Sequence, residues 1–93
     1  MIDVNRLLNS VGMATFVKYY YDFKNQSRDY CIRNFEEDFT DKAKSSKTGH
    51  VQSIFNRGLE KDALIKIAKA QRVDECAKHK AIKILEKDFS YTL

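Results

Sequence analysis

Residues 42–57 read KAKSSKTGHVQSIFNR, a stretch with four formal positive charges and no carboxylate. Its first half is rich in lysine, serine and threonine, as solvated loops often are. Its second half has three apolar side chains at the spacing of one helix side, namely Val51, Ile54 and Phe55. We therefore expect a helix of about three turns from Thr48, which Gly58 can end in the left-handed conformation. The candidate N-caps are Ser45, Ser46 and Thr48.

The polar side of this expected helix has the composition of a nucleic-acid contact surface. Arginine and asparagine donate hydrogen bonds to base edges and phosphates, while serine hydroxyls and helix N-termini bind phosphate oxygens. The sequence therefore predicts nucleic-acid contacts from Lys42, Lys44, Lys47, His50, Ser53, Asn56 and Arg57. The alternative interpretation is a solvated lysine-rich loop that leads into the outer side of an ordinary surface helix.

Segment 46–56 bears a faint resemblance to the recognition helix of repressor-type helix-turn-helix proteins. The resemblance rests on Val51, Ile54, Phe55 and Asn56. In that motif a helix precedes the recognition helix. Here the preceding segment, 37–44, puts Thr40 and Asp41 where a small buried apolar residue is required. The chain is therefore not assigned to the family, and a helix-turn-helix remains one option for its C-terminal half.

The composition favours helices over a sheet. The 93 residues include no proline and only three glycines, and no Asn-Gly or Asp-Gly pair marks a hairpin. Hydrophobic residues make up 43% of the chain, which is enough for a core in a single small domain. We expect an all-α fold, a compact orthogonal bundle of about five helices that spans residues 1–93.

Apolar spacing predicts where most of these helices lie. Asp3 can cap a first short helix, and residues 11–24 form the most apolar helix. Ser27 begins a helix whose inward side includes Ile32, Phe35 and Phe39. The C-terminal half adds helices over 59–70 and after the N-cap Asp74.

Charge and aromatic residues divide the chain into two halves. Residues 1–40 carry five basic and six acidic side chains, and residues 41–93 carry twelve basic and seven acidic ones. Eight of the eleven aromatic residues lie between Phe16 and Phe39. The first half is therefore predicted to supply packing and the second half charged contacts. Three lysines on one flank of the last helix, Lys80, Lys83 and Lys87, can extend the basic surface of 42–57 or form an ordinary solvated side.

Three consecutive tyrosines, Tyr19, Tyr20 and Tyr21, cannot all face one core, because successive helical residues point about 100° apart. The conservative interpretation is that they border the core, with their hydroxyls in water. The functional interpretation is a partner or homodimer surface, since tyrosine is enriched at interfaces. Stacking of exposed bases is a further option.

The sequence offers little support for catalysis or a metal. Cys76 and His79 are three residues apart, but a structural zinc site needs four ligands, and Cys31 and His50 are distant in sequence. Glu36, Glu37 and Asp38 fan around the expected helix and do not converge. No glycine-rich phosphate loop is present. We therefore expect no enzyme activity, no cofactor and no small-molecule substrate.

No run is apolar enough to cross a membrane, and no signal peptide is evident, so a cytoplasmic location is expected. In that compartment Cys31 and Cys76 are predicted to be separate and largely buried thiols, with a disulfide left open.

Two functional hypotheses follow. The first is a non-enzymatic module that binds nucleic acid in a regulatory or accessory role, with Lys80 and Lys83 added to the basic stretch. The second is a protein–protein interaction module: an adaptor, a homodimer, or a small inhibitor of a larger nucleic-acid-handling complex, of the kind encoded by mobile elements.

Overall fold

The computed structural model describes residues 3–92 and contains seven α-helices. They are α1 (Val4–Val11), α2 (Met13–Lys18), α3 (Tyr20–Asn25), α4 (Arg28–Arg33), α5 (Asp41–Asn56), α6 (Glu60–Lys69) and α7 (Glu75–Phe89). No strand occurs in residues 3–92, so the all-α prediction is confirmed, although the number of helices exceeds the expected five. None of the seven helices is both long and apolar enough to cross a membrane.

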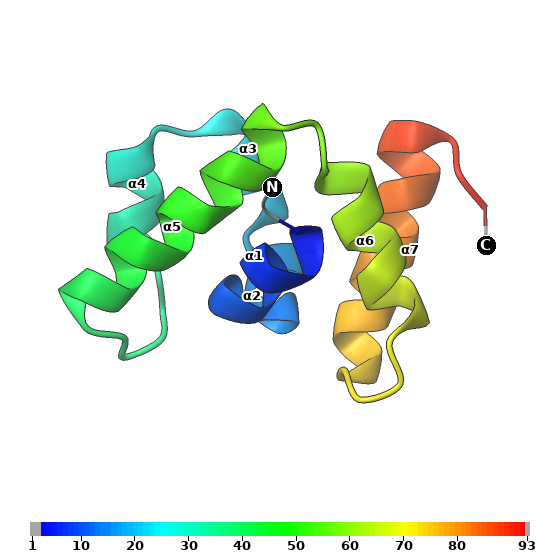
Figure 1. Cartoon of the computed structure of the whole chain (residues 1–93), viewed down its shortest axis with the longest axis horizontal. Helices are drawn as coiled ribbons and strands as arrows, with labels where there is room; N and C mark the ends of the chain where they lie inside the picture. The colour runs from blue at the N-terminus through cyan, green and yellow to red at the C-terminus, as the bar shows by residue number, and fades with distance from the viewer. Residues whose placement is uncertain (1–2, 93) are drawn as a thin grey trace.

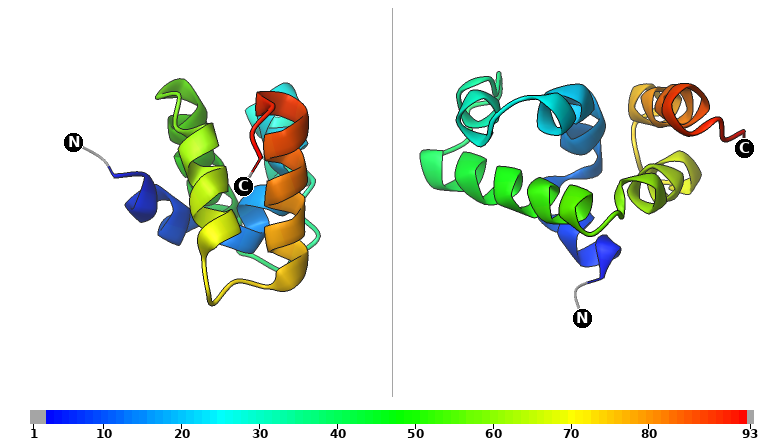
Figure 2. Two further views of the ribbon diagram at one scale, coloured as in Figure 1. Left: turned by 90° about the vertical axis from the view of Figure 1, so that its right-hand side faces the viewer. Right: turned by 90° about the horizontal axis from the view of Figure 1, so that it is seen from above.

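The helices form two layers (Figures 1 and 2). Seen from above, α1, α5 and α6 lie in one layer, and α4, α2–α3 and α7 lie in the other. Helix α1 packs on α5, and α6 and α7 form an antiparallel pair. Helices α5 and α7 therefore lie toward opposite ends of a body that measures 36 × 27 × 23 Å.

Helix α5 begins earlier than the sequence indicated. The hydroxyl of Thr40 accepts a hydrogen bond from the backbone N–H of Ala43 at 3.1 Å, which is N-cap geometry. The predicted caps Ser45, Ser46 and Thr48 are therefore inside the helix, and the expected loop over residues 42–47 is wrong. Alanine and lysine are good helix formers, and a capped first turn with an acidic Asp41 is enough to extend the helix through the serines.

The predicted end of α5 is confirmed. Gly58 has φ = 69°, and the N–H groups of Gly58 and Leu59 donate to the carbonyls of Phe55 and Ile54 at 3.1 and 2.9 Å. This pattern is a Schellman C-cap. Residues 34–40 are irregular and residues 41–44 belong to α5 itself, so the separate helix that the motif requires over 37–44 is absent, and the helix-turn-helix suggested by the sequence is not formed there.

Two other helix boundaries differ from the prediction. The helix expected over 11–24 is split, because Gly12 (φ = 94°) separates α1 from α2 and Tyr19 (φ = −111°, ψ = 20°) separates α2 from α3. The helix that Ser27 caps ends at Arg33, so Phe35 and Phe39 reach the core from an irregular segment. Their aromatic contacts, not helical periodicity, place them: the Phe35 ring lies 5.1 Å from that of Tyr19.

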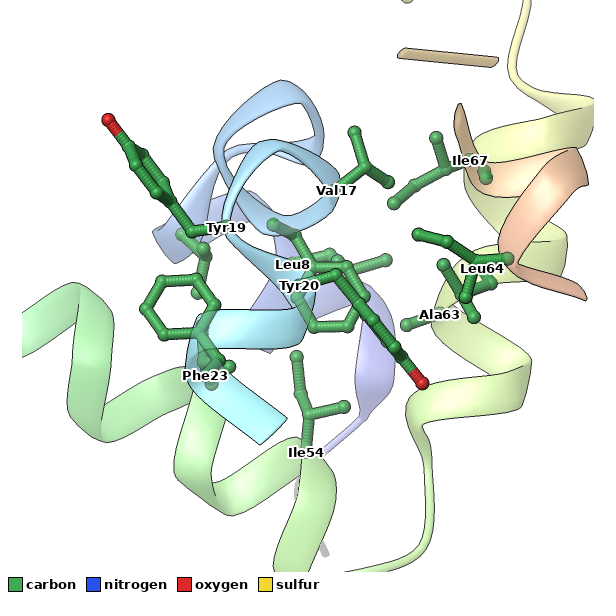
Figure 3. Close-up of a cluster of buried hydrophobic side chains, with 14 of the residues drawn as sticks. Leu8, Val17, Tyr19, Tyr20, Phe23, Ile54, Ala63, Leu64 and Ile67 are labelled. Atoms are coloured by element: carbon green, nitrogen blue, oxygen red, sulfur yellow. The ribbon is translucent and has the colours of Figure 1, made fainter. Parts of the chain in front are cut away.

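The core lies between the two layers and takes side chains from every helix. Tyr20 and Phe16 are its largest fully buried side chains, and their rings are 5.6 Å apart at 81°. Tyr19 and Tyr20 point in opposite directions from α2–α3, as Figure 3 shows. Both rings are buried, whereas Tyr21 is 39% exposed.

The Tyr20 hydroxyl is buried without a hydrogen-bond partner in the described chain. We expect Tyr20→Phe to raise the free energy of unfolding by about 1 kcal/mol, because an unsatisfied buried hydroxyl is destabilising. Urea unfolding at pH 7 measures this change. A loss of 1 kcal/mol or more would show that the hydroxyl does have a partner, such as a bridging water.

The same substitution has a pH signature. Burial raises the pKa of Tyr20 well above its usual value near 10, and the carboxylates of Asp88 and Glu60 raise it further. A raised pKa in the folded state means that stability is complete below pH 10 and falls as the pH rises toward the folded-state pKa. Tyr20→Phe is therefore also expected to make the fold more resistant to alkali.

Candidate nucleic-acid interface

Lys47, predicted to contact nucleic acid, turns inward. Its Nζ donates to the carbonyls of Val11 and Ser10 at 3.1 and 3.4 Å and lies 4.8 Å from the centre of the Phe39 ring. These carbonyls end α1, where a cation is favourable. Lys47 thus joins α1 to α5. The structure therefore corrects the sequence-based prediction, which placed Lys47 in an outward-facing site. Lys44 is half-buried one turn before Thr48, on the inward side of α5.

One strip along α5 is exposed or half-exposed to solvent. Because successive helical residues are rotated by about 100°, the residues of this strip lie on the side of the helix opposite the buried Val51 and Ile54. We call this strip the α5 face; its members are Lys42, Ser46, Gly49, Ser53, Asn56 and Arg57. From Lys42 to Arg57 the helix contains no carboxylate, and between these two cations the face consists of a glycine and small polar side chains. An anionic backbone can therefore approach the helix closely.

Arg28 of α4 borders one edge of the α5 face. Its Nη2 donates to the hydroxyl of Ser45 at 2.6 Å, and its Nη1 donates to Oε1 of Gln52 at 3.3 Å. A Cβ atom at Gly49 would lie 3.4 Å from Nη1, at van der Waals contact distance, so the guanidinium lies close against α5 at this position. Arg28 is thus held at the surface with N–H groups still free to bind phosphate.

Arg6 of α1 borders the other edge. It lines a hollow of about 350 Å³ together with Ser10, His50 and Ser53. His50 and Ser53 were predicted from the sequence, and the structure adds Arg6 beside them. Arg57 follows Ser53 by one helical turn, which places its guanidinium at the same end of the strip.

The cations around the α5 face are not neutralised within the described chain. Over residues 3–92 the ion pairs involve only Lys18 and Lys24, which lie on α2 and α3. The hydrogen-bond acceptors of Arg28 are neutral oxygen atoms, so they do not compensate the positive charge of its guanidinium group. Four full positive charges, from Arg6, Arg28, Lys42 and Arg57, therefore surround one strip of helix.

Sequence reasoning identified only part of this arrangement. Arg6 and Arg28 were missed, because each lies far from residues 42–57 in the sequence and reaches α5 only through the fold. Lys80 and Lys83 do not join the strip: they are on α7, toward the other end of the molecule (Figure 1). The structure thus separates the predicted basic surface into two.

The predicted partner surface at the three tyrosines shrinks to one residue. Tyr19 and Tyr20 are only 7% and 1% exposed. The structure therefore corrects the prediction that all three tyrosines form a partner surface. The hydroxyl of Tyr21 donates to Asp88 at 3.4 Å, and the ammonium of Lys87 lies 5.6 Å from its ring centre. Tyr30, 38% exposed, was not singled out from the sequence.

The cysteines and acidic residues form no metal centre in residues 3–92, where no three His, Cys, Asp or Glu side chains are grouped to hold an ion. Both thiols are free; Cys31 is buried and donates to the carbonyl of Asp22 at 3.3 Å, and burial raises its pKa. Cys76 is exposed on α7, so the expectation that both thiols are buried is wrong for Cys76.

Comparison with known proteins assigns no family to this arrangement. The chain matches no protein-family model, and no curated protein or solved structure is significantly similar to it.

Proposed function

We propose that this protein is a non-enzymatic module that binds nucleic acid through the α5 face. The observation that carries the proposal is the strip of small polar side chains without a carboxylate, bordered by Arg6 and Arg28 and ended by Lys42 and Arg57. Arginine binds phosphate oxygens in two parallel hydrogen bonds, and serine and asparagine suit phosphate or base edges.

The dimensions of the strip suit a polyanion. Lys42 and Arg57 are fifteen residues apart on one helix, which corresponds to about 22 Å along its axis. Several phosphates of a duplex or a single strand lie within that length. The small residues between the two ends let the nucleic-acid backbone approach the helix closely. The flanking guanidinium groups can therefore contact its phosphates at the same time.

The proposal predicts salt-dependent binding. With about four phosphates neutralised, the logarithm of the association constant should fall with the logarithm of salt concentration at a slope near −3.5 for a duplex, or about 100-fold between 50 and 200 mM. Fluorescence anisotropy with labelled single- and double-stranded DNA and RNA measures the slope. Affinity that barely changes over this range would contradict the proposal.

Paired double variants locate the surface. Arg6→Gln with Arg57→Gln should lower affinity at least tenfold and reduce the slope by nearly 2, because two phosphate contacts are lost. Lys80→Gln with Lys83→Gln removes the same charge from α7 and should change affinity no more than about threefold. Equal losses in the two double variants would rule out a site on the α5 face.

A further inference from the structure

A second surface, separate from the α5 face, lies between α2–α3 and α7. Two adjoining hollows of about 270 and 280 Å³ share Val17, Lys18 and Lys80 and form one shallow groove. Its floor is apolar, with Val17 contributed by α2 and Ala77 and Ile84 by α7. The groove follows α7 over the eleven residues from Ala77 to Lys87, which rise about 15 Å along the helix axis.

The rim of the groove on α7 is cationic. Lys80, Lys83 and Lys87 are spaced by three and four residues, so they share one flank of the helix, and all three are exposed. The Lys87 ammonium lies over the Tyr21 ring. Lys80 and Lys83 form no ion pair with any carboxylate in residues 3–92. Like charges at this spacing repel each other, and an anionic occupant would relieve that repulsion.

The opposite rim is already partly neutralised. Lys18 contacts Glu37 at 2.9 Å and Glu36 at 3.5 Å. Asp74 lies at one end of the groove, and Asp88 is engaged by Lys24 at 3.2 Å. The strongest uncompensated positive charge therefore follows the α7 rim, and a bound segment should place its carboxylates along that side.

We propose that this groove binds an acidic amphipathic helix of a partner protein. The apolar floor calls for aliphatic side chains on one side of the occupant, and the lysine rim calls for glutamate or aspartate beside them. A helix of three turns matches the length of the groove, and the seam between two helices suits a third one packed along it. Nucleic acid would pair with the lysines but leave the apolar floor unfilled.

Selection from a peptide library tests this proposal without a known partner. The probe is a displayed library of 15-residue helical peptides, randomised on all sides and selected against the full chain. We expect enriched peptides with an aliphatic stripe at i, i+3, i+4 and i+7 flanked by acidic residues. Absence of enrichment, or enrichment without acidic residues, would overturn the proposal.

An enriched peptide then locates the site. Lys80→Glu with Lys83→Glu should weaken its binding at least tenfold, because both charges on the rim are reversed. The matched control, Lys42→Glu with Arg57→Glu on the α5 face, should change binding less than threefold. Both pairs replace exposed side chains, and circular dichroism verifies that each variant is folded. Equal losses would show attraction by overall charge alone and refute a specific groove.

Backbone amide shifts distinguish the two proposed surfaces. The peptide should perturb Val17, Tyr21 and Ile84 and leave Ser46 and Ser53 unchanged. An oligonucleotide that produced the groove pattern instead would assign the groove to nucleic acid and refute the helix proposal. Peptide binding without oligonucleotide binding would support the groove while the proposed function fails, so the two proposals stand or fall separately.

Discussion

Lys47→Ala is expected to lower the free energy of unfolding by about 2–3 kcal/mol, a large loss for a lysine on a largely polar helix. The ammonium donates to the last two carbonyls of α1 and lies over the Phe39 ring. Hydrogen bonds from a charged donor contribute about 1.5–3 kcal/mol, and truncation also removes a cation–π contact. Urea unfolding followed by circular dichroism at pH 7 measures the loss.

Two further substitutions separate charge from packing. Lys42→Ala removes an exposed lysine from the same helix and should change stability by no more than about 0.5 kcal/mol. Lys47→Met keeps an apolar stem of similar length and should recover less than half of the alanine loss, because the carbonyls still lack their donor. If Lys47→Ala behaves like Lys42→Ala, the ammonium is in solvent and does not join α1 to α5.

The case of Lys47 shows where sequence reasoning ends. Lysine has a long apolar stem and a charged tip, so the residue type fits both an exposed phosphate contact and an internal cap. Only the position of the C-terminus of α1, more than thirty residues earlier in the chain, decides between them. The sequence pattern of residues 42–57 contains no information about that position.

Local signals were reliable where one residue determines the backbone. Asp3 and Ser27 cap the helices they were predicted to begin, and Gly58 ends α5 with a positive φ. The apolar spacing also identified the buried side of α5, where Val51 and Ile54 are fully buried. These features depend on contacts within a few residues, which is why the sequence alone predicts them.

Competing local signals were resolved by tertiary contacts. Thr40, Ser45, Ser46 and Thr48 are all chemically suited to cap a helix, and the chain uses Thr40. Thr48 is fully buried instead, with its hydroxyl donating to the Lys44 carbonyl at 2.8 Å. A hydroxyl satisfied within its own helix can enter the core, so the same residue type serves as a cap in one place and as a core side chain in another.

The candidate site shows the same division between local and distant information. Ser53, Asn56 and Arg57 could be placed on the polar side of the expected helix from their spacing alone, whereas Lys42 joins them only because α5 begins at Asp41. Arg6 and Arg28 come from other helices, and nothing in their local sequence marks them as neighbours of α5. Charge counted along the chain therefore indicated the right helix but not the residues that complete its surface.

Tyr19→Phe is expected to cost about 2 kcal/mol of unfolding free energy although every ring contact is retained. The hydroxyl donates to Oε1 of Glu37 at 2.6 Å and accepts from the N–H of Glu36 at 3.0 Å. It thereby holds the irregular segment 34–40 against α2. A hydrogen bond to a carboxylate is stronger than a neutral one, and removal of the hydroxyl also leaves the Glu36 N–H without the acceptor of a partly buried hydrogen bond. Urea unfolding at pH 7 tests the value.

A matched control and a pH series make the Tyr19 prediction specific. Tyr30→Phe removes an exposed hydroxyl for which the described chain offers no hydrogen-bond partner, and it should change stability by less than about 0.5 kcal/mol. Partial burial opposes ionisation of Glu37, but the hydrogen bonds from Tyr19 and Lys18 outweigh it and lower the pKa of that carboxyl. A lowered pKa stabilises the fold above the unfolded value, near 4, and the contribution is lost as the pH falls through the folded-state pKa.

The original chain should therefore lose stability more steeply below about pH 4 than Tyr19→Phe does, because the variant has already lost part of the interaction that favours ionised Glu37. The gap between the two stability curves should narrow toward pH 2, where the carboxyl is protonated in both proteins, and the gap that remains should correspond to the lost hydrogen bond from the Glu36 N–H. Parallel curves with a constant offset would mean that Tyr19 stabilises the segment through the Glu36 N–H alone. Identical curves for Tyr19→Phe and Tyr30→Phe would show that the hydroxyl does not hold segment 34–40 at all.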